Sequence, residues 1–123
     1  MEEGLLTHYS AVLASNNVSE SIEFYCFKLG FDLVDSYGNP PYYAEIRRDH
    51  AQSLMLLDQR SAGSPTGHVS LAFYSSAIDT VYEEFLAKDV VIKETLENKA
   101  YGMREFQIED PDGYLLVFRQ KIR

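Results

Sequence analysis

The sequence predicts an α+β domain in which one βαβββ module occurs twice and forms a mixed sheet. Two observations predict it. The order strand, helix and three strands can be assigned in each half of the 123-residue chain. The second copy also follows the first at a nearly constant offset, 58 residues between the opening strands (Leu13 and Leu71) and 59 residues between the helix ends (Gly30 and Asp89). Few residues are identical between the halves, so the prediction depends on element order and spacing.

Module one covers about residues 5–60, and its first strand is predicted over residues 9–14. The segment Ser-Asn-Asn at residues 15–17 then offers side chains that cap helices. Apolar residues follow at the spacing of one buried helical stripe, and they are Val18, Ile22, Tyr25, Cys26 and Leu29. Gly30 is typical of the residue just after a helix end. Three strands complete the module, and they are predicted over residues 31–37, 42–48 and 53–57.

Module two covers about residues 66–123 and follows a segment of loop composition at residues 58–67. A strand is predicted over residues 68–73. Apolar residues then form a second helical stripe, and they are Ile78, Val81, Tyr82, Phe85 and Leu86. The last three strands are predicted over residues 90–95, 103–109 and 114–120. The tetrad Asp-Pro-Asp-Gly at residues 110–113 is typical of a type I turn, stabilised by the side chains of Asp110 and Asp112.

The charge balance favours some partners over others. The chain has 19 acidic and 11 basic residues, a formal charge of -8 and a pI near 4.7. Such a surface repels phosphate backbones, which disfavours nucleic acid and favours cationic ligands. No apolar run approaches the roughly 20 residues of a membrane span, and the N-terminus lacks the pattern of a signal peptide. The position of the single cysteine, Cys26, in the helical stripe assigns it to the core. We expect a soluble cytoplasmic protein.

Two segments resemble a known family. The first is VLASNNVSESIEFYCFKLGFDL at residues 12–33, and the second is AYGMREFQIEDPDGYLLVFRQ at residues 100–120. Together they resemble the glyoxalase/bleomycin resistance/extradiol dioxygenase group, the vicinal oxygen chelate superfamily, over nearly the whole chain. The resemblance implies paired βαβββ modules, a U-shaped sheet around a cavity, and usually a homodimer.

The resemblance also identifies four positions at which metal-dependent members carry metal ligands, commonly His, Gln or Glu. In this chain those positions fall on Ser10, Leu56, His68 and Val117. Only His68 is a metal-ligating residue type, and leucine and valine have no lone pair to donate. We therefore expect no metal and no cofactor.

A cavity without its metal is typical of the bleomycin resistance branch of the family. The segment from Tyr101 to Phe106 resembles the aromatic-Gly-(Met)-Arg segment of that branch, with tyrosine in place of tryptophan. The leading hypothesis is a non-catalytic protein that sequesters a cationic or aromatic small molecule, such as a bleomycin-type antibiotic. One alternative is a glyoxalase-like or dioxygenase-like enzyme with an atypical metal site that uses His68 and His8. Another is a structural or regulatory member of the fold, which has no ligand and fills its cavity with residues such as Leu54.

Candidate ligand contacts are aromatic, acidic or imidazole side chains on strands of both modules. Tyrosine rings supply stacking area, and a carboxylate in a cavity holds an amine by a charge-assisted hydrogen bond. His68 is expected to share a cavity wall with Ser70 and Ala72, opposite apolar residues that face the second helix. The candidates are Tyr37, Tyr42, Tyr43, Glu45, His68, Tyr101 and Glu105.

Overall fold

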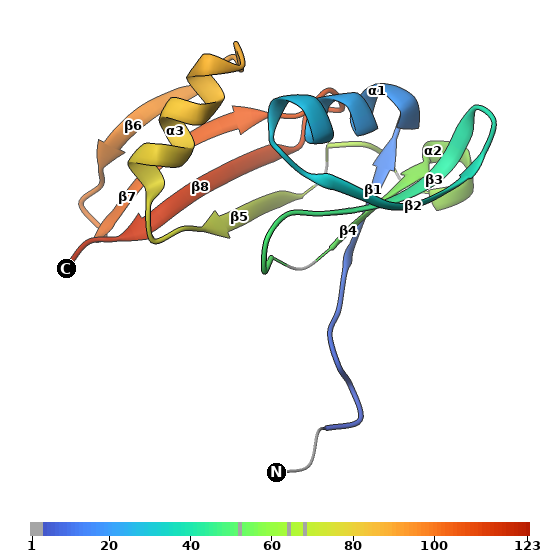
Figure 1. Ribbon diagram of the computed structural model, residues 1–123, viewed down its shortest axis with the longest axis horizontal. Helices are drawn as coiled ribbons and strands as arrows, with labels where there is room; N and C mark the ends of the chain where they lie inside the picture. Colours follow the sequence, from blue (N-terminus) through green and yellow to red (C-terminus); the bar gives the residue numbers. More distant parts are fainter. Residues whose placement is uncertain (1–3, 52, 64, 68) are drawn as a thin grey trace.

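The computed structural model describes residues 4–51, 53–63, 65–67 and 69–123. Module one forms a four-stranded sheet in the order β1-β4-β3-β2, in which β1 runs parallel to β4 and the other neighbours are antiparallel (Figure 1). Its strands are β1 (Ala11–Ser15), β2 (Asp32–Gly38), β3 (Pro41–Arg47) and β4 (Leu54–Asp58). Between β1 and β2 lie α1 (Val18–Glu23) and the π-helix η1 (Phe24–Lys28).

Module two repeats this topology in a second four-stranded sheet, ordered β5-β8-β7-β6. Its elements are β5 (Ser70–Tyr74), α3 (Ile78–Ala87), β6 (Glu94–Asn98), β7 (Met103–Glu109) and β8 (Leu115–Lys121). The predicted fold class of two βαβββ modules is confirmed. Among the described residues, no helix is long and apolar enough to cross a membrane.

Local predictions differ from the structure after β4 and after α3. The short helix α2 (Gln59–Ala62) occupies part of the predicted loop, because the Asp58 carboxylate accepts a hydrogen bond from the Arg60 amide and Gly63 ends the helix with a φ of 70°. Strand β6 begins at Glu94, later than expected, since Val90 belongs to the turn after α3 and packs into the core.

The predicted first helix begins where Asn17 accepts a hydrogen bond from the Glu20 amide at 3.0 Å. Its second half, however, is η1, with π-type hydrogen bonding. Gly30 follows with a φ of 75°, which glycine adopts without steric strain.

Both long helices lie on the same side of the two sheets (Figure 1), and one hydrophobic core fills the space beneath them. Alternate residues of each strand point toward this core. In module one, the buried strand residues beneath α1 are Leu13, Ala44, Ile46, Leu54 and Leu56. In module two, those beneath α3 are Phe106, Ile108, Leu116 and Phe118. We call the other side of each sheet the open face.

The turn before β8 joins the modules. The Asp110 carboxylate stabilises the turn as predicted, because it accepts hydrogen bonds from the amides of Asp112 and Tyr114, each at 2.9 Å. The same carboxylate also accepts a hydrogen bond from the Tyr25 hydroxyl at 2.8 Å. The Asp112 side chain differs from the prediction, because its described partners lie in module one. Asp112 accepts from the Asn16 amide at 2.8 Å. Each aspartate therefore connects the two modules.

Candidate ligand-binding surface

The open face of module one carries a cluster of tyrosines and carboxylates. The register of β2 and β3 places Asp35 opposite Glu45 and Tyr37 opposite Tyr43, and residues opposite each other share a face. The Tyr37 and Tyr43 rings lie 5.7 Å apart. We call these four residues the module-one patch.

The carboxylates of the module-one patch have no partner of opposite charge in the described part of the chain. Among the described residues, no Lys or Arg lies within ion-pair distance of Asp35 or Glu45. Partial burial, followed by the charges of Glu45 and Asp35, raises the pKa of the Tyr43 hydroxyl. The patch is thus an acidic surface with aromatic walls.

Tyr42 lies apart from this patch. Alternation along β3 places it on the same side as the buried Ala44, so it points away from Tyr43. Its ring lies against Gly38, where a Cβ atom would meet Tyr42 Cδ1 at 2.6 Å.

The open face of module two carries a second cluster, built around Glu105, whose exposed fraction is 2%. Its Oε1 accepts hydrogen bonds from Arg119 Nε at 3.1 Å and Nη2 at 2.7 Å, and its Oε2 accepts from the Tyr101 hydroxyl at 2.7 Å. The Arg119 guanidinium lies over two rings, 5.8 Å from the centre of Tyr74 and 5.7 Å from that of Tyr101. These four residues form the module-two patch.

Hydrogen bonding and the charge of Arg119 decide the ionisation state of Glu105. Burial by itself would raise the pKa of this carboxyl, but the Tyr101 hydrogen bond and Arg119 outweigh burial and lower the pKa. Glu105 is therefore an ionised carboxylate whose charge Arg119 already balances. Sequence reasoning selected Tyr101 and Glu105 but not Arg119 or Tyr74, although strand alternation places Arg119 on the same side as Val117.

A family model, Glyoxalase/Bleomycin resistance protein/Dioxygenase superfamily, matches residues 6–118. The chain belongs to this superfamily. The resemblance of the two sequence segments is confirmed. No curated protein sequence matches the chain.

Solved structures of other proteins share the fold. TnmS3, an antibiotic binding protein from Streptomyces sp. CB03234, is 21% identical with a TM-score of 0.79, and the match covers 97% of this chain and 99% of that one. TioX from Micromonospora sp. ML1 is 19% identical with a TM-score of 0.79, covering 94% and 99%. Virulence protein STM3117 from Salmonella typhimurium is 27% identical with a TM-score of 0.73, covering 98% and 100%.

The superfamily's metal positions do not offer a metal-binding set of donors here. Ser10 Oγ is hydrogen-bonded to Ser53 Oγ at 2.5 Å, and Val117 presents a hydrocarbon to the open face. The assignment of Leu56 is wrong, because its side chain is 1% exposed in the core beneath α1. By the module repeat, the counterpart of Val117 is Leu57, since Ala14 pairs with Leu57 as Ala72 pairs with Val117.

Leu57 has no lone pair either. Among the described residues, no group of three or more His, Cys, Asp or Glu could hold a metal ion. His68 lies outside the described residues. Alternation predicts that Val69, Leu71 and Phe73 face the core on the other side of the strand from Ser70 and Ala72. Leu71 and Phe73 do pack against the core, but Val69 is 50% exposed and precedes β5. Leu54, which would fill the cavity under the hypothesis of a member without a ligand, is buried on the helix side of its sheet.

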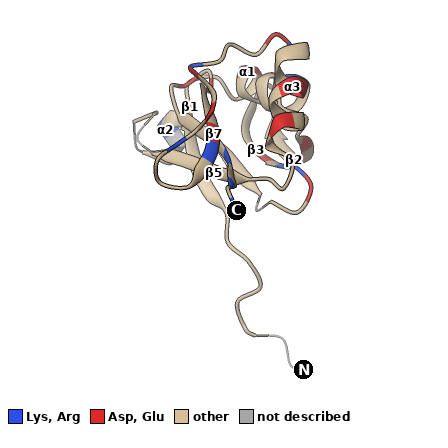
Figure 2. Ribbon diagram, turned by 90° about the vertical axis from the view of Figure 1, so that its left-hand side faces the viewer, with Lys and Arg blue, Asp and Glu red and all other residues tan. Residues whose placement is uncertain are grey.

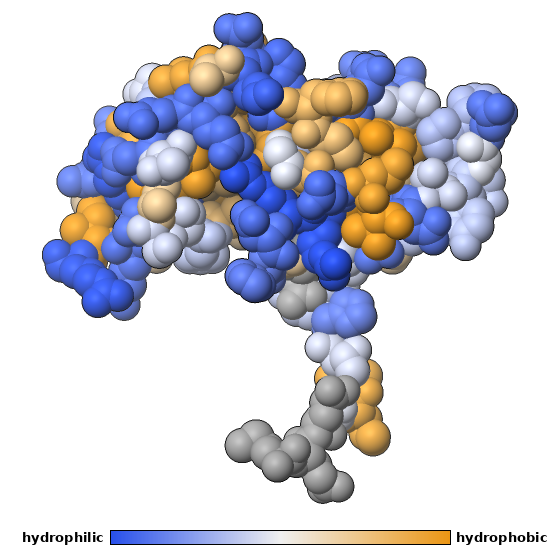
Figure 3. Space-filling view, viewed as in Figure 1, coloured by the Kyte–Doolittle hydropathy of each residue, from blue (hydrophilic) through white to orange (hydrophobic). Residues whose placement is uncertain are grey.

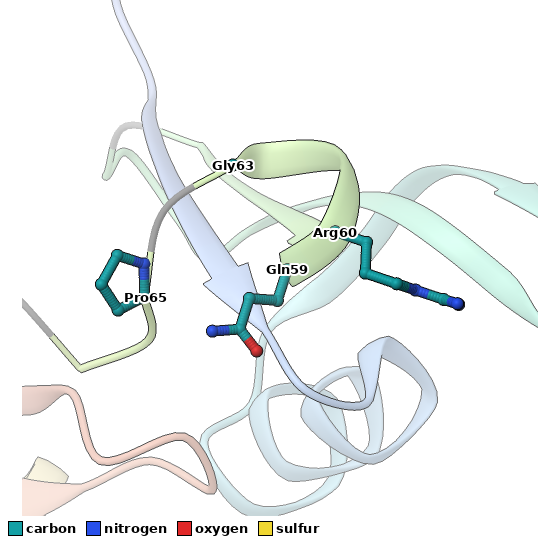
Figure 4. A pocket seen from close by; sticks show the side chains of 4 residues that line it. All are labelled: Gln59, Arg60, Gly63 and Pro65. Atoms are coloured by element: carbon teal, nitrogen blue, oxygen red, sulfur yellow. The ribbon is translucent and has the colours of Figure 1, made fainter.

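A hollow of about 430 Å³ beside α2 is separate from both patches. Figure 4 shows Gln59 and Pro65 near one another and the Arg60 side chain directed away from them. Arg60 has a side-chain exposure of 94%, and the residues that line the hollow include no aromatic ring. It does not match the aromatic site that the sequence predicts.

Proposed function

We propose that the protein binds a cationic, aromatic small molecule without transforming it, as bleomycin resistance proteins do, and that it acts as a cytoplasmic homodimer. The observation that carries this proposal is the module-one patch, in which two carboxylates, without a basic partner among the residues that the structure describes, lie beside two tyrosine rings. The description of TnmS3 as an antibiotic binding protein, on the same fold, is consistent with it.

The cation preference follows from the register of β2 and β3. Like charges directly opposite each other on a sheet face are destabilising by about 0.2–1 kcal/mol. A ligand amine beside Asp35 and Glu45 would remove that repulsion and form charge-assisted hydrogen bonds. The rings of Tyr37 and Tyr43 would add cation–π attraction. The formal charge of -8 favours the approach of such a ligand.

The homodimer is supported by apolar surface that no helix covers. Val12, Tyr37, Tyr74 and Tyr101 are each more than half exposed on or beside the open faces. The segment before β1 extends away from the body and carries Leu5 and Leu6, which are almost fully exposed (Figure 3). A second copy would bury this surface, and the open faces of two copies would then enclose the ligand.

The test is a titration with bleomycin, followed by calorimetry and by tyrosine fluorescence, which is practical because the chain has nine tyrosines and no tryptophan. We expect saturable binding. Glu45→Gln should weaken it about tenfold and reduce its salt dependence, because one charge-assisted hydrogen bond is lost. Tyr42→Ala, on the other side of β3, is the control and should bind as the unmodified protein does. Absence of heat and of any fluorescence change at high micromolar bleomycin would refute the drug assignment.

A further inference from the structure

A second hollow, of about 750 Å³, lies where the two modules meet. Its lining excludes both patches, apart from the edge residue Tyr74. Module one contributes Ala11, Phe31 and Leu54, and module two contributes Leu71, Phe73 and Phe118. We call this hollow the inter-module cleft. Its volume lies within the roughly 300–1,000 Å³ of small-molecule sites, which often form between structural units.

The floor of the cleft is a fixed group of aromatic rings drawn from both modules. Phe31 meets Phe73 edge-on with ring centres 6.0 Å apart, and Phe73 stacks on Phe118 at 4.9 Å with an interplanar angle of 14°. Phe31 and Phe118 are 5% and 6% exposed, so the surrounding core holds both rings. A flat apolar molecule would contact a surface that already exists and needs little ordering.

The Arg48 guanidinium at the mouth of the cleft is already paired. Arg48 Nη1 and Nη2 donate to Glu84 at 2.7 Å and 2.9 Å, and Nη1 also donates to the Leu29 carbonyl at 2.7 Å. This pair joins the turn after β3 to α3, so it holds one wall of the cleft against the other. Asp49 also lies at the mouth, with its carboxylate 3.3 Å from Arg48 Nε, but its side chain is 78% exposed, so water screens this charge and the apolar floor decides the class of ligand.

A buried hydroxyl provides the polar contact. Ser53 lines the cleft, is 3% exposed, and is hydrogen-bonded through its Oγ to Ser10. A hydroxyl has one donor and two acceptor sites, so the bond between the two serines leaves one donor and three acceptor sites of this pair for other partners. A single polar group on an otherwise apolar ligand would be recognised there.

We infer that the inter-module cleft binds an uncharged molecule with a flat aromatic body and one hydrogen-bonding group directed at Ser53. This site is independent of the one proposed on the open faces. Because its walls come from both modules, a ligand in it contacts the native arrangement only and stabilises it. At one hundred times its Kd, such a ligand should raise the unfolding midpoint by roughly 10 °C.

The test uses Nile red, a neutral flat dye with a carbonyl acceptor whose emission shifts to the blue in apolar surroundings. We expect one saturable site per chain and a matching rise in Tm. Ser76→Trp places an indole at the mouth, at an exposed position that tolerates it, and should weaken dye binding at least tenfold. Ser19→Trp, on the exposed side of α1, is the matched control and should not change binding.

Two further variants locate the dye. Ser53→Ala should weaken binding a few-fold while the blue shift is retained, because only the polar contact is lost. Tyr101→Ala, in the module-two patch, should leave dye binding unchanged. Equal binding by the Ser76→Trp and Ser19→Trp proteins would overturn the inference, as would loss of dye binding in Tyr101→Ala. Since bleomycin and Nile red are measured separately, failure of one site leaves the other open to test.

Discussion

The hydrogen bond from the Tyr25 hydroxyl to Asp110 gives the most direct test of how the modules are joined. Tyr25→Phe removes the hydroxyl and leaves the ring, which is fully buried and packs edge-on against Phe24 and Phe31. Asp110 would keep its backbone donors but lose its link to module one. The variant therefore tests one bond rather than a cavity.

The expected cost follows from the environment of the acceptor. A hydrogen bond to a charged group contributes about 1.5–3 kcal/mol, and Asp110 is 5% exposed, so water replaces the lost donor poorly. We expect a loss of about 2 kcal/mol in the free energy of unfolding. For a domain of this size, that corresponds to a fall in Tm of roughly 8 °C.

The pH dependence gives an independent check. Burial raises the pKa of the Asp110 carboxyl, against the effect of its hydrogen bonds. The folded state thus retains a proton on Asp110 at a pH where the unfolded state has released it, and the contribution of Asp110 to stability declines as pH rises through that window. Removing the Tyr25 donor raises this pKa further, so the cost of Tyr25→Phe should be largest at neutral pH and smaller in acid.

Urea unfolding followed by far-UV circular dichroism at pH 7 and pH 4 measures both quantities. Tyr42→Phe is the control, because its ring is half exposed and lies against Gly38 at the end of β3, and it should cost less than about 0.5 kcal/mol. If Tyr25→Phe costs no more than this control, or costs the same at both pH values, the Asp110 bond does not join the modules as described.

Three further outcomes are expected. Glu105→Gln should cost about 2 kcal/mol in the free energy of unfolding at pH 7. Because the pKa of Glu105 is lowered in the folded state, its contribution to stability is complete above its ordinary pKa and is lost as pH falls through the folded value. Urea unfolding should therefore show the stabilities of the two proteins converging in acid. Arg48→Lys should cost about 1 kcal/mol, since lysine cannot bind Glu84 at two points, and a double-mutant cycle with Glu84→Gln should give a coupling energy above zero. Gly38→Ala should cost more in thermal unfolding than Gly63→Ala, because both have positive φ but only Gly38 has an atom within 3.0 Å of the added Cβ.

The sequence was sufficient to predict the fold because the periodicity of each element matches its environment. Helical stripes beginning at Val18 and Ile78 mark the faces that pack on the sheets, and β7 has the predicted bounds. The π-helical half of the first helix was not predicted. Its apolar residues have nearly the same spacing as in an α-helix, so the pattern does not distinguish the two.

The candidate site was predicted less completely, because strand pairing decides which side chains meet. Alternation correctly groups Tyr37, Tyr43 and Glu45 only after the register of β2 and β3 is known. Arg119 was missed for a similar reason, since its partner Glu105 lies opposite it on another strand, 14 residues earlier in the chain. The error at Leu56 shows that a register shift of one residue exchanges an open-face position for a core position.

The two modules differ in whether a pair of opposed carboxylates is neutralised by nearby cations. In module two, Glu97 lies opposite Glu105, and the chain supplies a cation to each, Lys99 at 2.8 Å and Arg119 at 2.7 Å. Figure 2 shows a basic segment at β7, whereas β2 carries acidic residues.

In module one, Asp35 and Glu45 are opposed in the same way, but no described basic side chain lies within ion-pair distance of either. If these two carboxylates bind the ligand, a cation added to the patch should both stabilise the protein and abolish ligand binding. Met55, which lies opposite Glu45 on β4, is the position at which to add it. Met55→Lys should raise Tm and weaken bleomycin binding at least tenfold, and a variant that gains stability while binding normally would show that the carboxylates do not contact the ligand.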